Sequence, residues 1–472
     1  MSGMIETDIC VIGAGSGGLS VAAGAVQMGA RVVLVEGAQM GGDCLNHGCV
    51  PSKALIAAAG AAQAMAAGGR FGVAPVVPQV DYAAAKDHVA ATIAAIAPHD
   101  SQERFEGLGV QVIRARGRFI APDTVEAGAA RIRARRLVIA TGSRPMIPPI
   151  PGLDSVPYLT NETLFALRDR PAHLVVIGGG PIGLEMAQAH RRLGSAVTVI
   201  EAAAALGRED PDLAAVVLDR LRAEGIAIHE HSAVSRVKGS AGAITVHHEG
   251  GRIEGSHLLV AVGRVPAIDD LGLEAARIRA TPKGITVNAG LRTSNRRVFA
   301  IGDAAGQGQF THLAGYHAGI VVRSAVLGLP ARTRTDHIPR ATYTDPELAQ
   351  IGLTEAEARR RHGPAITVLR VALAENDRAR AKGVEGGLLK LVVHRGRPVG
   401  AGIAGPQAGE MIAFWALAIA NRLKMSAIAG TVLPYPTLAE AHKRAASAYF
   451  SPKLFDNAVL RRVVRLVQRL LP

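Results

Sequence analysis

The sequence predicts a multidomain α/β protein, because it contains two copies of an apolar strand, a glycine turn and a helix start. The first copy reads DICVIGAGSGG and the second reads LVVIGGGPIGLE. At 472 residues the chain is too long for a single ordinary core, so we expect about three domains. Strands that lead into helices in this way are typical of an α/β fold.

Composition narrows the class of protein. The formal net charge is +14, but the arginines are dispersed and aromatic residues make up only 3% of the chain, so we predict no nucleic-acid partner. Three cysteines and no secretory signal in MSGMIETD predict a cytoplasmic protein rather than a disulfide-stapled one. The longest weakly polar stretch, residues 54–69, is mostly Ala and Gly, so we expect no membrane-spanning helix.

An acidic residue ends the strand that follows each glycine turn, 23 positions after the first glycine in both copies. Glycines let the backbone approach a pyrophosphate at a helix N-terminus, and the acid receives the ribose hydroxyls. We therefore predict two dinucleotide sites rather than two chance glycine turns. The predicted contacts are Gly13, Gly15, Gly18 and Glu36 in the first site and Gly178, Gly180, Gly183 and Glu201 in the second.

Glu201 also bears on the choice of nucleotide. A carboxylate accepts a hydrogen bond from a free 2′-hydroxyl but repels a 2′-phosphate. We expect NADH to be preferred over NADPH, although Arg208, seven residues later, would weaken that preference.

The segment GGDCLNHGCVPSKAL, residues 41–55, carries two of the three cysteines, Cys44 and Cys49. In a cytoplasmic protein such a pair is a set of metal ligands, two buried apolar residues or a redox pair. Only His47 is close enough to extend a ligand set, so we predict no metal site. In an unbroken helix, residues five apart have Cα atoms about 8.6 Å apart, beyond the limit of roughly 7 Å for a disulfide. Bridging therefore requires a break, which Gly48 permits.

Cys49 is expected near the N-terminus of a helix that continues through Pro51 and Lys53, because proline is tolerated in a first helical turn. A helix N-terminus and a lysine one turn along both stabilise a thiolate. The pair is therefore predicted to cycle between dithiol and disulfide. Cys10, in the middle of the strand ICVIG, is expected to be a core residue.

Four motifs together identify a family: GAGSGG, GGDCLNHGCVPSKAL, GGGPIGLE and AIGDAAG. From about residue 7 to about residue 450, the sequence resembles the class I pyridine nucleotide-disulfide oxidoreductases, which include dihydrolipoamide dehydrogenase, glutathione reductase and mercuric reductase. The resemblance implies two Rossmann-like dinucleotide-binding domains, for FAD and NAD(P), plus a C-terminal α+β dimerisation domain that makes a homodimer. The expected segments are 1–150 (FAD), 151–268 (NAD(P)), 269–335 (completing the FAD domain), 336–450 (interface) and 451–472 (tail).

The resemblance also implies a route for electrons from NADH through the flavin to Cys49, then to Cys44, then to an acceptor. Cys49 would be the proximal sulfur that forms a charge-transfer thiolate, and Cys44 the interchange sulfur that attacks the acceptor. Lys53 would lie beside the flavin N5 with Glu185 as its carboxylate partner, unless Glu185 only serves its helix start. Further FAD contacts are expected at Gly117, Thr141, Gly142, Asp303, Thr311 and His312, and an NAD contact at Gly263.

The sequence departs from the family near its end. Disulfide reductases of the family carry an HPTxxE element, whose histidine acts on the partner subunit's thiol. Here the segment is LPYPTLAEAHKRAA, with Tyr435 in the histidine position and Glu440 retained. A phenol with a pKa near 10 is a poor base at neutral pH, so dihydrolipoamide oxidation is in doubt. His442 does not replace the histidine, because on a helix it points about 200° away from Glu440.

Tyr435 and Tyr158 resemble mercuric reductase instead, but no cysteine follows Cys49 to pass a metal inward. His47 either compensates, by lowering the pKa of Cys44 or by donating a proton, or is a polar residue on the rim. We predict a FAD-dependent enzyme that reduces a small-molecule or protein disulfide, or another thiol-reactive acceptor. The alternatives are a mercuric-ion, quinone or other non-disulfide reductase, and a low-turnover redox sensor.

The chain ends in NAVLRRVVRLVQRLLP, beyond the usual end of the family. On a helical wheel its polar residues fall within about 120° and Val and Leu fill the opposite side, which predicts a basic amphipathic helix. This helix either docks on its own or the partner subunit, or makes a peripheral membrane or protein contact through residues 457–472. Its polar face consists of Arg461, Arg462, Arg465, Gln468 and Arg469.

Overall fold

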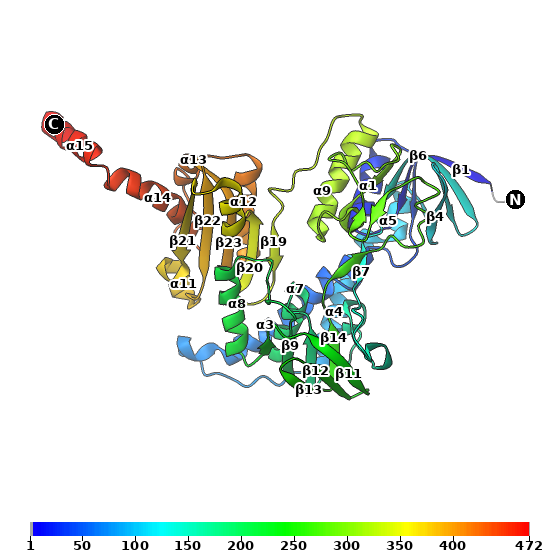
Figure 1. Cartoon of the computed structure of the whole chain (residues 1–472), viewed down its shortest axis with the longest axis horizontal. Coiled ribbons are helices and arrows are strands. Elements are labelled where there is room, and N and C mark those ends of the chain that lie inside the picture. The colour runs from blue at the N-terminus through cyan, green and yellow to red at the C-terminus, as the bar shows by residue number, and fades with distance from the viewer. Residues whose placement is uncertain (1–2, 472) are drawn as a thin grey trace. The chain divides into compact units, whose positions relative to one another are not determined.

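The structure is a computed structural model that describes residues 3–471, and it forms two compact units. The first unit contains the chain up to Ala203 together with Ile226–Arg334. The second contains Ala204–Gly225 together with the chain from Thr335 onward. Figure 1 labels the elements of both units.

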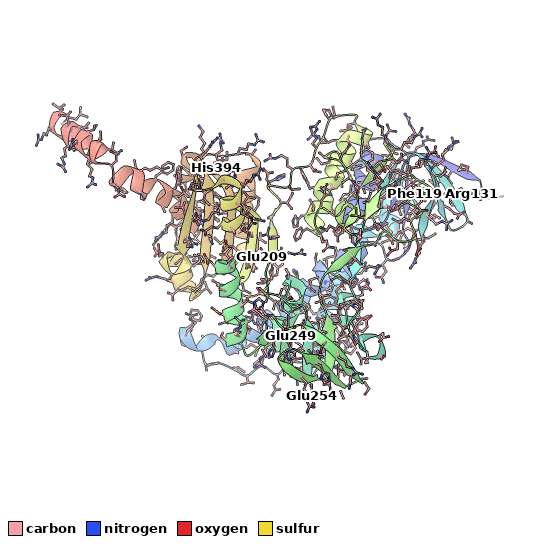
Figure 2. The ribbon with its side chains drawn as sticks, in the orientation of Figure 1. Phe119, Arg131, Glu209, Glu249, Glu254 and His394 are labelled. Atoms are coloured by element: carbon pink, nitrogen blue, oxygen red, sulfur yellow. The ribbon has the colours of Figure 1, made fainter. Side chains whose placement is uncertain are left out.

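The first unit contains a seven-stranded sheet with the order β3-β2-β1-β6-β5-β4, in which β18 also pairs with β6. Strands β3, β2, β1, β6 and β18 are parallel, whereas β5 and β4 extend the sheet in antiparallel fashion. Runs of Val, Ile and Leu buried on both faces suit such a sheet, and Phe119 of β4, labelled in Figure 2, belongs to its core. The strands are β1 (Met4–Ile12), β2 (Val32–Val35), β3 (Gln111–Ile113), β4 (Gly117–Ala121), β5 (Thr124–Ala127), β6 (Ala130–Ile139) and β18 (Val298–Ala300).

A second, wholly parallel sheet in the same unit has the order β10-β9-β8-β14. A three-stranded antiparallel sheet, β11-β12-β13, and two two-stranded sheets, β15-β7 and β16-β17, accompany it. The strands are β7 (Ser143–Pro145), β8 (His173–Ile177), β9 (Ala196–Ile200), β10 (Ala227–His229), β11 (Val234–Ser240), β12 (Ala243–His248), β13 (Gly251–Gly255), β14 (His257–Val260), β15 (Arg264–Pro266), β16 (Ala280–Thr281) and β17 (Gly284–Ile285).

Helices follow both glycine turns, as predicted. They are α1 (Ser16–Gln27) after the first turn and α7 (Pro181–Arg192) after the second. The other helices of this unit are α2 (Gly42–Asn46), α3 (Cys49–Ala66), α4 (Tyr82–Ile96), α5 (Gln102–Gly107), α6 (Asn161–Leu164) and α9 (Thr311–Val321), with a 3-10 turn, η4, at Gly302–Ala305. Two parallel sheets with helices confirm the α/β class.

The second unit is built on a five-stranded antiparallel sheet with the order β19-β20-β23-β22-β21. Its core is apolar around the fully buried Trp415. The strands are β19 (Arg340–Thr342), β20 (Glu347–Gly352), β21 (Ile366–Ala372), β22 (Leu388–His394) and β23 (Arg397–Gly405). The helices are α8 (Pro211–Ala223), α10 (Glu355–His362), α11 (Asp377–Lys382), α12 (Ala408–Ala420), α13 (Met425–Ala429), α14 (Glu440–Phe455) and α15 (Ala458–Leu470).

Helix α8 lies within the segment predicted for the NAD(P) domain, yet it packs in this second unit. Asp210, which caps α8, forms a buried ion pair with Lys390 of β22 at 2.8 Å. Glu209, labelled in Figure 2, pairs with Arg340 at 2.8 Å. A buried charge is stable only when it is paired, so these contacts tie the helix firmly to the sheet.

Candidate active site

The two glycine turns have the same backbone geometry. Ile12 of β1 pairs with Val35, and Ile177 of β8 pairs with Ile200, so both strand pairs have the same register. The N–H of the first glycine bonds to the carbonyl of the second strand in each copy, at 2.8 Å for Gly13 and 2.9 Å for Gly178. The repeated sequence spacing therefore corresponds to a repeated local structure.

The two acids also occupy matching positions. Glu36 accepts hydrogen bonds from the N–H of Ala14 at 2.5 Å and of Ala38 at 2.6 Å. Glu201 accepts them from the N–H of Gly179 at 2.7 Å and of Ala203 at 2.9 Å. Each carboxylate is thereby held at the turn, where the ribose of a dinucleotide would lie.

The three glycines of each turn have different steric surroundings. The first has a positive φ, +104° at Gly13 and +115° at Gly178, which L side chains rarely adopt. At the third, a Cβ would lie 1.9 Å from the Gly13 oxygen in one copy and 2.0 Å from the Gly178 oxygen in the other. At the second glycine the space is open in both copies. A Cβ on Gly15 has its nearest neighbour at 3.9 Å, and a Cβ on Gly180 has none within 4 Å.

This pattern fits a bound pyrophosphate at each turn. The first glycine provides the bend, the third the close helix–strand contact, and the open second position lets a ligand approach the backbone. Beside the first turn, Thr141 Oγ1 is buried without a hydrogen-bond partner, and Gly142 has a φ of +70° with open space around it. A polar ligand at this position would satisfy the Thr141 hydroxyl.

Three further residues predicted to contact a cofactor are Asp303, Gly263 and Gly117. Asp303 of η4 accepts a hydrogen bond from Ser143 at 2.5 Å, and burial raises the pKa of its carboxyl. Gly263 has a φ of +137°. A Cβ on Gly117 would lie 3.1 Å from Val35 of β2 and 3.2 Å from Ile12 of β1, so this glycine packs closely, and its contact with FAD stays a prediction.

The cysteine segment is attached directly to the first glycine turn. The N–H of Gly41 bonds to the Ala14 carbonyl at 3.0 Å, and a Cβ on Gly42 would lie 2.7 Å from the Cα of Gly15. Helix α2 carries Cys44 and ends at Asn46, and helix α3 begins at Cys49. The predicted break between the cysteines and the predicted helix start at Cys49 are both confirmed.

The two sulfurs are chemically unequal. The Cys44 thiol donates a hydrogen bond to the Cys49 sulfur, and this bond is the main reason that the pKa of Cys49 falls to about 6. Thr311 Oγ1, 3.4 Å from the Cys49 sulfur, and the charge of Lys53 act in the same direction, while burial opposes them. The same sulfur–sulfur bond, together with burial, raises the pKa of Cys44. These contacts therefore favour the proton on Cys44 and the thiolate on Cys49.

A half-buried ion pair connects this segment to the helix that follows the second glycine turn. Lys53, one turn into α3, donates to Glu185 of α7 at 2.8 Å. The Glu185 side chain is 6% exposed and the Lys53 side chain 37% exposed. The dithiol segment is thus bonded to one turn through its backbone and to the other through a side chain.

Sequence reasoning missed a polar chain that supports the cysteines. Arg264 of β15 pairs with Asp43, next to Cys44, at 3.1 Å, and its Nε donates to Ser143 at 2.7 Å. Asn161 also donates to Asp43, at 3.0 Å. Asp43 stands inside the motif that the sequence analysis singled out, but its partners are more than a hundred positions away and left no local signal.

The substituted proton-transfer element lies in the second unit. The Tyr435 side chain is 70% exposed and donates to Asp377 at 3.1 Å, an interaction that raises the pKa of the phenol. Glu440 accepts from the Thr437 N–H at 3.3 Å. His442 is buried and stacked on Phe414, and burial lowers its pKa to about 4. A buried, neutral His442 is not available as a base, as the sequence predicted.

Three other residues from the sequence analysis have definite surroundings. The His312 ring stacks on Phe310 with centroids 5.2 Å apart. The carbonyl of His47 accepts from Asn161 at 3.1 Å, and the role of its ring stays a prediction. Cys10 is buried in the core of the first sheet. No metal-binding cluster of His, Cys, Asp or Glu occurs between residues 3 and 471.

Two dinucleotide cradles bonded to one dithiol define a nucleotide-dependent oxidoreductase. Comparisons with known proteins agree. The family model described as pyridine nucleotide-disulphide oxidoreductase matches residues 7–318, and its dimerisation-domain model matches residues 338–446. The chain belongs to this family. It is therefore a FAD-dependent pyridine nucleotide-disulfide oxidoreductase that uses NAD(P)H, and its dimerisation domain supports a homodimer.

Several relatives span nearly the whole chain. A mercuric reductase from Streptomyces lividans is 35% identical over 460 residues, covering 94% of this chain and 96% of that protein. A dihydrolipoyl dehydrogenase from Geobacillus stearothermophilus is 33% identical over 455 residues, with 94% and 96% covered.

Solved structures show the same architecture. LpdA from Mycobacterium tuberculosis superposes with a TM-score of 0.86 at 27% identity, covering 94% of this chain and 99% of that chain. The Cu(II) complex of the HOCl-induced flavoprotein disulfide reductase RclA from Escherichia coli gives 0.84 at 28% identity, with the same coverage.

Proposed function

We propose that this enzyme passes electrons from NADH to a disulfide or another thiol-reactive acceptor, and that Cys44 is the sulfur that attacks the acceptor. The observation that carries the proposal is the position of Cys49 at the start of α3, 3.4 Å from Thr311 and one turn before Lys53, both predicted flavin contacts, which leaves Cys44 for the acceptor. The Cys44 thiol, whose pKa is raised by its hydrogen bond to Cys49 and by burial, must lose its proton before it attacks. FAD, held at the first glycine turn beside Lys53 and Thr311, would supply two-electron transfer between the nicotinamide and the Cys44–Cys49 disulfide.

The proton needed for turnover is supplied within the pair. Tyr435 is a poor base, because its phenol keeps its proton more tightly than usual. The Cys44 proton instead moves along its hydrogen bond to Cys49, which leaves Cys44 as the attacking thiolate. Attack on a disulfide RSSR forms a Cys44–S–SR bond and releases RS⁻, which takes the proton from Cys49. The Cys49 thiolate then attacks Cys44, re-forms the internal disulfide and releases the second RS⁻, which is protonated by solvent.

Replacing Cys44 with Ser tests the attacking sulfur. In C44S, the rate of NADH-dependent reduction of an aromatic disulfide such as dithiobis(nitrobenzoate) should fall by at least about a thousandfold. Flavin reduction by NADH in the same variant should persist, and it is followed as bleaching of the flavin absorbance. Retained disulfide reduction by C44S would contradict the proposal and would favour direct electron transfer from the flavin, as in a quinone reductase.

A second candidate acceptor is a soft metal ion such as Hg(II) or Cu(II). The observation that favours it is the replacement of the usual histidine by Tyr435, because a metal ion accepts electrons without a leaving thiolate that needs a proton. The relative from Streptomyces lividans is a mercuric reductase, and the RclA structure is a Cu(II) complex. Against this candidate, no cysteine follows Cys49 in the sequence. Comparing NADH oxidation with lipoamide, glutathione disulfide, Hg(II), Cu(II) and quinones discriminates among these acceptors.

We propose NADH as the preferred nucleotide, since the Glu201 carboxylate is fixed at the second turn by two backbone N–H groups. Replacing Glu201 with Ser should reduce the ratio of kcat/KM for NADH over NADPH about tenfold, because the repulsion of a 2′-phosphate is lost. Steady-state assays with both nucleotides measure the ratio. An unchanged ratio would remove Glu201 from nucleotide selection.

We propose a cytoplasmic location, with a peripheral contact through residues 457–472. The cytoplasm keeps thiols reduced and contains the NADH that the enzyme needs. From residue 3 to residue 471, the structure contains no helix of the length and apolar character required to cross a bilayer.

A further inference from the structure

The last helix of the chain has no buried residue. α15 begins after Asn457, whose side chain accepts a hydrogen bond from the Leu460 N–H at 3.0 Å. This cap satisfies a free donor of the helix and fixes where the helix begins without help from the rest of the protein. Figure 1 shows α15 continuing outward beyond α14, away from the five-stranded sheet of the second unit.

One face of α15 is apolar and lies open to solvent. The exposed fractions reach 67% at Val459, 56% at Leu466 and 71% at Leu470. Phe455, at the end of α14, is 70% exposed as well. The other apolar residues of the face are Leu460, Val463, Val464 and Val467, and the exposed Leu471 follows the helix. Contiguous exposed apolar surface of this kind marks an interaction site, because water disfavours it.

The opposite face is uniformly basic. Four of the five residues on it are arginines, and residues 457–472 contain no Asp or Glu. A pairing of two such helices through their apolar faces would leave the arginines of both without a negative partner from the other helix. α15 has 13 residues, fewer than two heptads, whereas a self-standing coiled coil needs about three or four. A second copy of the helix is therefore a poor partner.

We propose that α15 binds the surface of an anionic phospholipid bilayer as an interfacial helix, lying in the plane of the membrane. Its apolar face would enter the boundary between headgroups and acyl chains, and its guanidinium groups would bind lipid phosphates. A helix of 13 residues is about 20 Å long, shorter than the hydrocarbon core of about 30 Å, so it lies on the bilayer and does not cross it. The inference extends the proposed peripheral contact and is independent of the identity of the acceptor.

Flotation of the full-length, FAD-loaded protein with lipid vesicles tests this inference. Binding to vesicles of phosphatidylcholine and phosphatidylserine (7:3) should be at least about tenfold stronger than binding to phosphatidylcholine alone, and should weaken as salt is added. Deleting residues 457–472 should abolish it. NADH-dependent flavin reduction, measured in parallel, should not change, so a failure of lipid binding is distinguishable from a failure of the proposed redox chemistry.

Two matched pairs of variants distinguish lipid binding through the two faces of α15 from binding through the overall positive charge of the protein. R461E/R465E and R236E/K238E change the net charge equally, but the second pair of substitutions falls on exposed residues of β11. The tail variant should lose at least about tenfold in vesicle binding and the β11 variant less than about threefold. L466D and Q468D each add one negative charge to α15, on the apolar and the polar face respectively. L466D should weaken binding more, because it places a charge in the acyl region.

Three results would overturn the inference. One is equal flotation of the intact and truncated proteins. Another is equal loss in R461E/R465E and R236E/K238E, which would make binding a property of the overall charge. The third is a drop in oligomeric state on truncation, seen by light scattering without any lipid, because a second copy would then cover the apolar face.

Discussion

The two helices that follow the glycine turns carry different side chains at the matching position, two residues after the third glycine. This residue is Ser20 in α1 and Glu185 in α7. Ser20 is exposed and donates back to the Ser16 carbonyl of its own helix at 2.7 Å. Glu185 is buried and reaches across to Lys53 beside the cysteines. At this position the side chain of one helix bonds to its own helix and that of the other bonds to the segment that carries the cysteines, although the two turns have the same backbone register.

The two copies also differ in the segment that comes after the acid. Glu36 leads into the cysteine segment, which is bonded to the first turn through Gly41. After Glu201 the chain leaves the first unit at Ala204 and returns at Ile226. The segment between the acid and the next strand therefore has a different role in each copy.

The largest effect is expected where the copies are most alike. G18A and G183A each place a Cβ about 2 Å from a backbone oxygen, at 1.9 and 2.0 Å, and a clash with backbone should cost about 3 kcal/mol or more. G18A should yield protein that retains little FAD. G183A should retain FAD but lose reduction by NADH. Absorbance of the bound flavin, before and after NADH, measures both.

The matched controls are G15A and G180A, at the open second glycines. Both should fold with a melting temperature close to that of the natural protein, because the added methyl group meets little or nothing within 4 Å. Weakened FAD retention and a raised KM for NADH, respectively, are the expected results. If G180A left KM unchanged, the open space at the second turn would not be a nucleotide site.

An intermediate effect is expected where the copies differ in one side chain. E185Q removes the charge that pairs with Lys53 and leaves that lysine without its buried carboxylate, so flavin reduction by NADH should slow by about tenfold, equivalent to about 1.4 kcal/mol. S20A, at the matching position of α1, should leave the rate within a factor of two. Stopped-flow absorbance measures both rates, and equal rates for the two variants would mean that the ion pair is structural only.

The last expected effect concerns the sulfur pair, which only the first copy carries. The pKa of Cys49 is lowered from 9.0 to about 6, so the thiolate is present above about pH 6 and is lost as the pH falls through that value. C44A removes the donor and should raise this midpoint by about one pH unit or more, whereas C44S keeps a hydroxyl donor and should raise it less. The pH dependence of Cys49 alkylation by iodoacetamide measures the midpoint. Identical midpoints in C44A and C44S would show that the sulfur–sulfur hydrogen bond does not set the pKa.

Sequence reasoning succeeded where a few neighbouring residues determine the backbone conformation of their own segment. The glycine spacing predicted both turns, and the acid spacing predicted the matching positions of Glu36 and Glu201. The break between Cys44 and Cys49 followed from helix geometry and from Gly48. Tyr435 in place of histidine was likewise recognisable, because the surrounding motif fixed its position.

Apart from the Lys53–Glu185 pair, which the family resemblance implied, sequence reasoning predicted no contact between residues far apart along the chain. Nothing local indicates that Arg264 reaches Asp43, or that Thr311 lies against the Cys49 sulfur rather than only near a flavin. The placement of α8 in the second unit depends on a buried pair between Asp210 and Lys390, 180 positions apart. Such contacts depend on how whole elements pack, and no periodicity in the sequence records them.

The sequence by itself determined the two cradles, the cysteine pair and the basic tail, because glycine conformation, helix caps and helical periodicity act over a few residues. Only the tertiary structure decided which neighbours stabilise the thiolate that the sequence predicts at Cys49. Lys53, Glu185 and Thr311 are separated by more than a hundred positions and are assembled around Cys49 by the packing of α3, α7 and α9. Charge and hydrogen bonding act through space, so the chemistry of a thiol is set by its neighbours in the fold.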